Sequence, residues 1–148
     1  MRYLPNGKQM SEADAHTIHK IGIPSLVLME RAALQIVETM QKKNISTEKS
    51  LIVCGSGNNG GDGFAVARLL TEQGKHADVL FAGREASLSE ECRCQKQIVE
   101  NMGISVFTEF PDEEYTVIID AVFGVGLCRE ITGHYKDAVS YTHLTLPT

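Results

Sequence analysis

A glycine-rich segment between an apolar run and a helical pattern constrains the fold of this chain more than any other feature. Residues 51–63 read LIVCGSGNNGGDG, and apolar residues recur at helical spacing over residues 64–70. Glycines let a ligand approach the backbone closely, and a helix N-terminus presents free N–H groups and the positive end of its dipole. The segment therefore predicts a strand, an anion-binding turn and a helix, with phosphate or pyrophosphate as the expected ligand. The glycines are Gly55, Gly57, Gly60, Gly61 and Gly63.

The same turn carries three polar side chains that phosphate binding alone does not require, namely Asn58, Asn59 and Asp62. Two amides and a carboxylate suit a hydroxylated or amide-bearing ligand, or a hard cation that prefers oxygen ligands. The alternative is that Asn and Asp occur here because they favour turns and helix N-caps. That alternative explains the polar residues but not the number of glycines.

The pattern G-x-G-x-x-G is present over residues 55–60, between a predicted strand and a predicted helix. A dinucleotide-dependent oxidoreductase would also have an acidic residue at the end of the second strand, to bind the ribose hydroxyls. The second strand is expected over residues 77–82, where Asp78 stands at the start and Arg84 follows the end. The sequence therefore keeps the oxidoreductase only as an alternative.

Strand and helix patterns alternate along the chain, which predicts a three-layer, Rossmann-like α/β fold with a mostly parallel sheet and helices on both faces. The helices are expected over residues 11–20, 25–42, 62–73 and 87–102, and the strands over residues 51–54, 77–82, 104–107 and 116–119. Gly74 and Gly103 are expected to end helices. The apolar face of helix 25–42 is Leu26, Met29, Ala33, Ile36, Val37 and Met40.

A second loop with glycines follows the fourth predicted strand. That strand runs into Asp120, and residues 124–130 include two glycines and Arg129. Ligands of open α/β sheets bind beyond the carboxyl ends of the strands, so Asp120 and the first loop are expected to share one cleft. The alternatives are that Asp120 caps a helix and that Arg129 is a solvated surface charge.

Composition excludes several classes of partner. The net charge of −5 argues against nucleic acid or an anionic membrane as the main partner. No apolar run approaches the roughly 20 residues of a membrane span, and the first residues do not resemble a signal peptide. The four cysteines lack metal-ligand spacing and are expected to be reduced thiols in the cytoplasm, with Cys54 packing rather than acting as a nucleophile.

The two loops together resemble the YjeF N-terminal domain, the NAD(P)H-hydrate epimerase family. The resemblance rests on residues 57–63, 67–69 and 120–129, while residues 11–14 and 22–32 are similar to the two leading helices of the family. It implies an isomerase that repairs NADHX and NADPHX, the hydrates of NADH and NADPH, by interconverting their R and S forms. No redox cofactor is implied, because the hydrated dinucleotide is the substrate.

The resemblance also implies roles for individual residues. One potassium ion per subunit would be bound by Asn59 and Asp120. Epimerisation at C6 needs only loss and return of water, or ring opening and closure, so a modest acid or base suffices. Asp62 and Asp120 are the candidates, and a water held by the ion is a third. The substrate would contact Asn58, Asn59, Gly60, Gly61, Asp62, Gly124, Val125, Gly126, Leu127, Cys128, Arg129 and Glu130.

The resemblance further implies a cytoplasmic homodimer that is fused to, or works with, an ADP- or ATP-dependent dehydratase. Residues 1–139 are expected to form the domain, incomplete at its C-terminus, since residues 140–148 do not resemble the strand and Val-Asp-x-Pro-Ser-Gly-like segment that follow in the family. A truncated or chimaeric reading frame is therefore expected. The other alternative is a non-catalytic dimerising scaffold, as in mRNA-decapping enhancers, and a potassium requirement would favour the epimerase over both alternatives.

Overall fold

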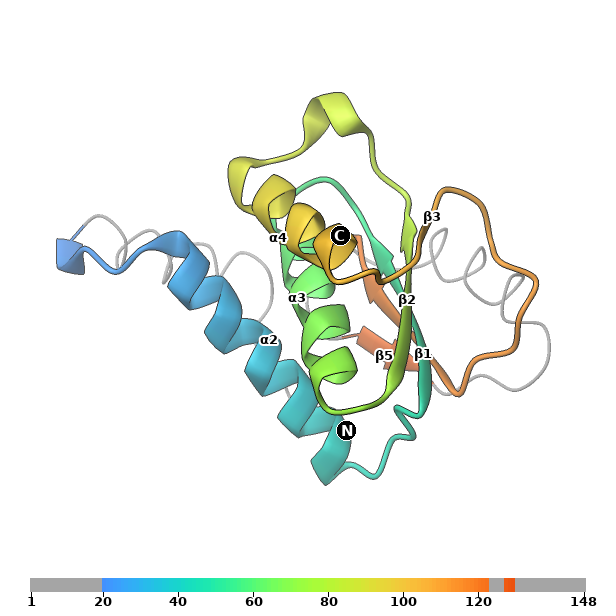
Figure 1. The fold of residues 1–148 in the computed structure, drawn as a ribbon. Coiled ribbons are helices and arrows are strands. Elements are labelled where there is room, and N and C mark those ends of the chain that lie inside the picture. Colours follow the sequence, from blue (N-terminus) through green and yellow to red (C-terminus); the bar gives the residue numbers. More distant parts are fainter. Residues whose placement is uncertain (1–19, 123–126, 130–148) are drawn as a thin grey trace.

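Strands joined by helices form a single sheet, with the strand order β3-β2-β1-β4-β5 (Figure 1). The computed structural model describes residues 20–122 and 127–129. The elements are α2 (Ser25–Lys42), β1 (Lys49–Cys54), α3 (Asn58–Glu72), β2 (His76–Phe81), the 3-10 turn η2 (Glu85–Ser87), α4 (Glu90–Asn101), β3 (Val106–Phe107), β4 (Val117–Ala121) and β5 (Leu127–Arg129). Strands β1 to β4 are parallel and β5 is antiparallel to β4, which confirms the predicted α/β class and mostly parallel sheet.

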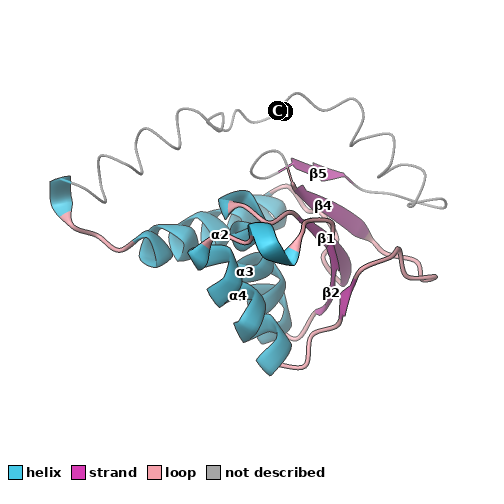
Figure 2. Ribbon diagram, turned by 90° about the horizontal axis from the view of Figure 1, so that it is seen from above, coloured by secondary structure: helices cyan, strands magenta, loops and turns pink. Residues whose placement is uncertain are grey.

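The helices α2, α3 and α4 all lie on the same face of the sheet (Figure 2). The connections from β1 to β2 and from β2 to β3 step in one direction across the sheet, and right-handed crossovers in one direction place their helices on one face. In the described ranges no helix covers the other face. The described residues thus provide one of the two helical layers that the sequence predicts, and most of the helix expected over residues 11–20 lies outside them.

The hydrophobic core is divided by the sheet into two unequal parts. Strand residues alternate between the faces, so Ile52 and Cys54 face the helices whereas Leu51 and Val53 face away from them. The larger part packs the apolar faces of the three helices on the sheet around the fully buried Phe64. The smaller part contains Leu51, Val53, Leu80, Tyr115 and Ile118, with Phe107 and Phe110 against it.

The described helices end within one residue of the predicted positions, but two of them begin elsewhere, and α4 begins at Glu90 rather than at residue 87. Helix α2 has the predicted bounds, although Leu26 is 38% exposed and belongs to no core cluster. Gly74 and Gly103 follow helix ends with φ angles of +81° and +79°, which glycine adopts without strain. Helix α3 begins at Asn58 rather than at residue 62, so the prediction for its start was wrong.

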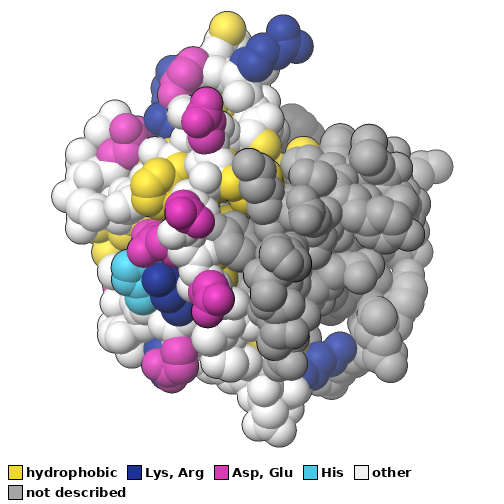
Figure 3. Space-filling view, turned by 90° about the vertical axis from the view of Figure 1, so that its right-hand side faces the viewer, with side chains coloured by type: hydrophobic (Ala, Val, Ile, Leu, Met, Phe, Trp, Pro, Cys, Tyr) yellow, Lys and Arg dark blue, Asp and Glu magenta, His cyan; other side chains and the backbone are white. Residues whose placement is uncertain are grey.

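Charged side chains are interspersed on the surface that carries the β3–β4 connection (Figure 3). On the helical side, Arg68 of α3 forms ion pairs with Glu30 of α2 and Glu72 of its own helix. None of the helices described here has the length and apolar content that crossing a membrane would require.

Candidate functional site

The chain order of the strands reverses between β1 and β4, with β2 on one side of β1 and β4 on the other. In open α/β sheets this switch point, at the carboxyl ends of the strands, is where ligands bind. The register pairs Val53 with Asp120 and Cys54 with Ala121. The glycine-rich segment follows Cys54 directly, so it lies at the same edge as Asp120. The prediction that the two meet at one sheet edge is confirmed.

The N-terminus of α3 is open to approach by a ligand. Its N-cap is Gly57, which has no side chain to bind the first N–H groups, and the first backbone bond runs from the Gly61 N–H to the Gly57 carbonyl oxygen over 3.1 Å. The N–H groups before Gly61 therefore have no acceptor within the helix. A Cβ atom on Gly57 would meet nothing within 4 Å. This turn can take an anion, as the sequence predicts.

At three of the five glycines a Cβ would meet neighbouring atoms at 2.8 Å or less, so packing as well as ligand approach accounts for the number of glycines in this segment. A Cβ on Gly60 would lie 1.9 Å from the Gly55 carbonyl oxygen. On Gly63 it would lie 2.6 Å from the Ala121 Cβ and 2.8 Å from the Cys54 Sγ. On Gly61 it would lie 2.6 Å from the end of the Met29 side chain. These glycines let α3 begin directly against the sheet and α2.

Asp120 is a buried carboxylate inside β4, not in a loop after it, with 6% of its surface exposed. Its Oδ1 accepts a hydrogen bond from the Val122 N–H at 2.9 Å, an Asx-turn pattern rather than a helix cap. Because it alternates with Ile119 and Ala121, Asp120 shares the face of Ile118, opposite to the helices. Asp62 approaches the same strand ends from the helical side and is half-buried.

Two buried thiols, Cys54 and Cys92, lie at this edge, where the Cys92 Sγ is 3.6 Å from the Gly55 carbonyl oxygen. Burial raises the pKa of Cys54 well above its usual value, and the charges of Cys92, Asp120 and Asp62 raise it further. Burial likewise raises the pKa of Cys92 to about 11, with Lys96 opposing the shift and Asp62 adding to it. Neutral, buried thiols of this kind are poor nucleophiles. The structure therefore confirms that Cys54 packs in the core.

Several residues that brace the first loop were missed from the sequence. The loop that leads into α4 crosses the end of β1, where the Ser89 N–H donates to the Ser56 carbonyl oxygen at 2.9 Å. Gly83 lies against Ser56, since a Cβ there would be 2.6 Å from the Ser56 nitrogen. Ser89 also donates through Oγ to Asn58 Oδ1 at 2.8 Å. The one available signal was that a serine before two glutamates is typical of a helix N-cap.

The structure describes only part of the second predicted loop. Residues 127–129 form β5, with Asp120 paired to Leu127, so this part is an edge strand rather than a loop. Phe123, Gly124, Val125, Gly126 and Glu130 lie outside the described residues. The backbone of β5 nevertheless pairs with β4, so Leu127, which lies within this predicted substrate segment, is beside Asp120 in the sheet.

The end of β2 lacks the acidic residue of a dinucleotide-dependent oxidoreductase. The strand ends at Phe81, and the exposed Arg84 follows. Asp78 lies in the third position of the strand, buried, and accepts a hydrogen bond from the Tyr115 hydroxyl at 2.7 Å. Asp78 is therefore part of the core at the other end of the strands and is not available for ribose.

The fold and this edge define an open α/β protein with an uncapped helix N-terminus at its topological switch point, where ligands of such sheets bind. Residues 25–144 match the family described as YjeF-related protein N-terminus, and the chain belongs to that family. It is 43% identical over 138 residues to the NAD(P)H-hydrate epimerase of Oenococcus oeni, a match that covers 92% of this chain and 66% of that protein.

Other relatives with the same name give a similar picture. The protein of Weissella koreensis is 43% identical over 83% of this chain and 56% of its own length, and that of Limosilactobacillus reuteri is 42% identical over 93% and 66%. The chain thus spans 56–66% of the length of these relatives. The crystal structure of yeast ynu0, YNL200c, superposes with a TM-score of 0.68 at 20% identity, over 95% of this chain and 65% of that one, which supports the fold.

Proposed function

We propose that this chain is an NAD(P)H-hydrate epimerase, which interconverts the R and S forms of NADHX and NADPHX. One observation carries the proposal. The uncapped N-terminus of α3, which begins with the polar NNGGD segment, and the buried Asp120 lie at the same edge of the sheet. The relatives named for this activity share 42–43% of their aligned residues with the chain.

The substrate has an anionic part that suits the N-terminus of α3. Its pyrophosphate would accept hydrogen bonds from the first N–H groups of the helix, where the dipole favours negative charge. Gly57 gives access, and the Asn58 and Asn59 side chains add amide groups beside it. The residues from Gly60 to Asp62, and those from Gly124 to Glu130, would complete the contacts.

The reaction needs a proton donor and acceptor at the hydroxyl on C6 of the nicotinamide ring. Loss of that hydroxyl as water leaves a cation that the ring nitrogen stabilises, and return of water to the other face gives the second epimer. A carboxyl group can protonate the leaving hydroxyl and accept the proton from the returning water. Asp62 and Asp120 are our candidates, since both lie at this edge and the charges of both raise the pKa of the Cys54 thiol.

The residues at the edge also fit a potassium ion. Monovalent and other hard cations prefer oxygen donors, and the side chains of Asn59 and Asp120 supply an amide oxygen and a buried carboxylate at the end of β4. When bound, the ion would supply positive charge that steadies phosphate or ribose oxygens. We propose one such ion per subunit, held by Asn59 and Asp120.

The deciding experiment follows the interconversion of purified R- and S-NADPHX by this chain with potassium or sodium chloride at equal ionic strength, using chromatography to separate the epimers. Circular dichroism is recorded first on the same sample. Potassium-dependent equilibration supports the epimerase and is not expected of a scaffold or an oxidoreductase. A folded chain that leaves both epimers unchanged in either salt contradicts the proposal.

Four further properties are proposals of the same kind. The chain would act as a cytoplasmic homodimer, would supply its product to an ADP- or ATP-dependent dehydratase, and would consist of a domain over residues 1–139 and a separate tail over residues 140–148. Light scattering on a size-exclusion column tests the dimer, and limited proteolysis with mass spectrometry tests the boundary. A monomer at all concentrations, or a tail as protease-resistant as the domain, contradicts the respective statement.

A further inference from the structure

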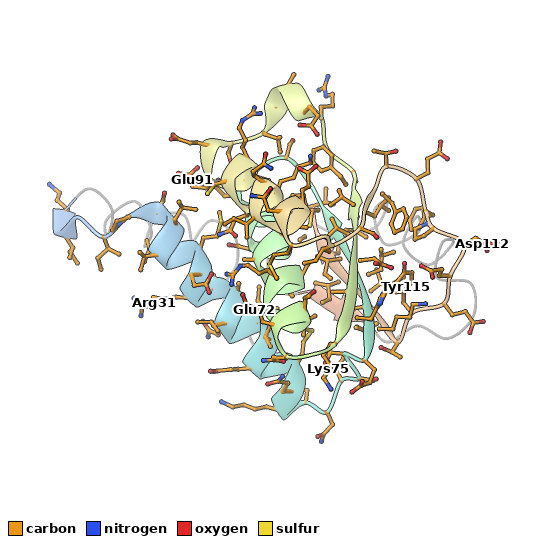
Figure 4. The ribbon with its side chains drawn as sticks, in the orientation of Figure 1. Arg31, Glu72, Lys75, Glu91, Asp112 and Tyr115 are labelled. Atoms are coloured by element: carbon orange, nitrogen blue, oxygen red, sulfur yellow. The ribbon has the colours of Figure 1, made fainter. Side chains whose placement is uncertain are left out.

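Ser89 lies where the loop that leads into α4 crosses the glycine-rich loop after β1. These two loops form the described wall of the candidate site. The Ser89 N–H donates to the Ser56 carbonyl oxygen at 2.9 Å, which ties the start of α4 to the first loop. The first turn of α4 is also held from α2, since the Ser25 hydroxyl donates to Glu91 Oε1 at 2.7 Å (Figure 4). The position of Ser89 is therefore fixed by both backbone and neighbouring helices.

The Ser89 hydroxyl makes two hydrogen bonds of opposite sense. As the N-cap of α4, Oγ accepts a hydrogen bond from the Cys92 N–H at 3.1 Å. The same oxygen lies 2.8 Å from Asn58 Oδ1 and donates to it. A serine hydroxyl has one hydrogen and two lone pairs, so it can do both at once. The cap uses a lone pair, and the hydrogen goes to Asn58.

The structure places the Asn58 amide in one of its two orientations, with the amide oxygen toward Ser89. The amide oxygen accepts from Ser89, so the NH₂ group is the part of the side chain that can donate to a ligand. Asn58 is the first residue of α3, directly after the uncapped Gly57, and its side chain is exposed. Its NH₂ group thus adds a donor to the N–H groups at the anion-binding turn.

We infer that Ser89 is a positioning residue of the dinucleotide site: its hydroxyl, shared between the α4 cap and Asn58, holds the Asn58 amide with its donors toward the substrate phosphate or ribose oxygens. The inference deepens the proposed function and rests on it for the substrate. Ser89 itself touches no reacting atom, and its effect is exerted through Asn58.

The substitution Ser89→Asp separates capping from positioning. An aspartate accepts the Cys92 N–H as well as serine does, because both are preferred N-cap residues. It has no hydrogen to donate, so the Asn58 amide must turn its NH₂ group toward the new carboxylate. Helix α4 should stay folded, while the KM for NADPHX rises about tenfold and kcat changes little, as for the loss of a ground-state hydrogen bond.

Two matched variants complete the test. Ser89→Thr keeps a hydroxyl that can both donate and accept, and it should restore the KM. Ser87→Asp places the same charge two residues earlier, on an exposed side chain of η2, and should leave the KM unchanged. In an Asn58→Ala background, Ser89→Asp should have no further effect on the KM, because the group it would misplace is absent.

A spectroscopic readout keeps the inference distinct from the proposed function. The side-chain NH₂ resonances of Asn58 in a ¹H–¹⁵N spectrum should shift in Ser89→Asp and remain near their wild-type positions in Ser89→Thr and Ser87→Asp. Unchanged resonances in Ser89→Asp would overturn the inference, and so would shifted resonances with an unchanged KM. A wild-type chain that does not epimerise refutes the proposed function, whereas the resonances still decide whether Ser89 orients Asn58.

Discussion

Gly60 lies so close to Gly55 that a Cβ atom on Gly60 would be 1.9 Å from the Gly55 carbonyl oxygen and 2.6 Å from its carbonyl carbon. The first turn of α3 thus rests on the backbone that leaves β1. A backbone carbonyl cannot rotate away as a flexible side chain can. The absence of a side chain at Gly60 is therefore a condition for α3 to begin at Asn58, and with it for the anion-binding turn.

Gly60→Ala is expected to lower the free energy of unfolding by about 3 kcal/mol, the upper part of the range for overpacked cores, because the added methyl group displaces backbone. Urea unfolding followed by circular dichroism measures the loss. Gly57→Ala is the control, since a Cβ there meets nothing within 4 Å and its φ of −88° suits any residue. Its stability should fall by no more than about 1 kcal/mol, the loss expected when alanine replaces a favoured N-cap residue. Equal losses in the two variants would contradict the packing role.

The sequence predicts the elements whose signals are local. The three- and four-residue spacing of Met29, Ala33, Val37 and Met40 defines the buried face of α2, and all four side chains are buried. Gly74 follows the end of α3 because its positive φ angle of +81° suits glycine and no other residue as well. The order of the strands and the meeting of Asp120 with the first loop follow from general rules for parallel sheets.

Features that depend on contacts between distant segments could not be predicted in this way. G-x-G-x-x-G does not say which glycine faces a ligand and which faces a strand, and only the packing of α3 on Cys54 and Ala121 distinguishes Gly57 from Gly63. The bond from Ser89 to Asn58 joins residues 31 positions apart. The helical spacing of apolar residues begins only after Asp62, whereas the first turn of α3, from Asn58, is defined by its packing on the sheet.

Tyr115 and Asp78 form a buried pair away from the candidate site, on the side of the sheet that the described helices leave uncovered (Figure 4). Tyr115→Phe removes the donor at 2.7 Å and leaves the Asp78 carboxylate buried. We expect the free energy of unfolding to fall by about 1–3 kcal/mol, the cost of an unmade bond to a buried polar group. Urea unfolding measures it, and the epimerisation rate should not change. A loss of activity without a loss of stability would contradict the assignment.

The same tyrosine makes stability depend on alkaline pH. Burial and the hydrogen bond to Asp78 raise the pKa of Tyr115 above its usual value of 10. A group whose pKa is raised by folding contributes stability that is present below the unfolded pKa and is lost as the pH rises above it. The stability advantage of the wild type over Tyr115→Phe should therefore shrink between about pH 10 and pH 11. Urea titrations at several pH values test this, and an advantage that grows with pH would refute it.

The described thiols should differ in reactivity. Burial raises the pKa of Cys54 and of Cys92, the latter to about 11, whereas Cys94 is half-buried. Because the thiolate is the reactive form, iodoacetamide at about pH 8 should modify Cys94 first and the other two only on unfolding. Peptide mapping by mass spectrometry identifies the modified residue, and labelling in urea shows that all sites can react. Modification of Cys54 in the folded chain at the rate of Cys94 would contradict its buried position.

Asparagine substitutions separate the roles proposed for the two aspartates, on the basis of the proposed function. Asp120→Asn keeps an oxygen to accept the Val122 N–H bond at 2.9 Å but removes the negative charge. If Asp120 binds potassium, the concentration for half-maximal activity should rise about tenfold or more, because a cation loses its charged ligand. Asp62→Asn should instead lower kcat by about a hundredfold or more, as for the loss of a general acid or base, with the potassium requirement unchanged.

The control for both substitutions is Asp112→Asn, an exposed aspartate in the β3–β4 connection, distant from the site (Figure 4). It removes the same charge and should change neither kcat nor the potassium requirement. Initial rates of NADPHX epimerisation over a series of potassium concentrations distinguish the outcomes. A normal potassium requirement in Asp120→Asn would exclude Asp120 as a ligand. A large fall in kcat in Asp120→Asn at saturating potassium, with Asp62→Asn near the wild type, would favour the buried aspartate over Asp62 for the proton transfer, because a lower kcat reports an interaction lost in the transition state.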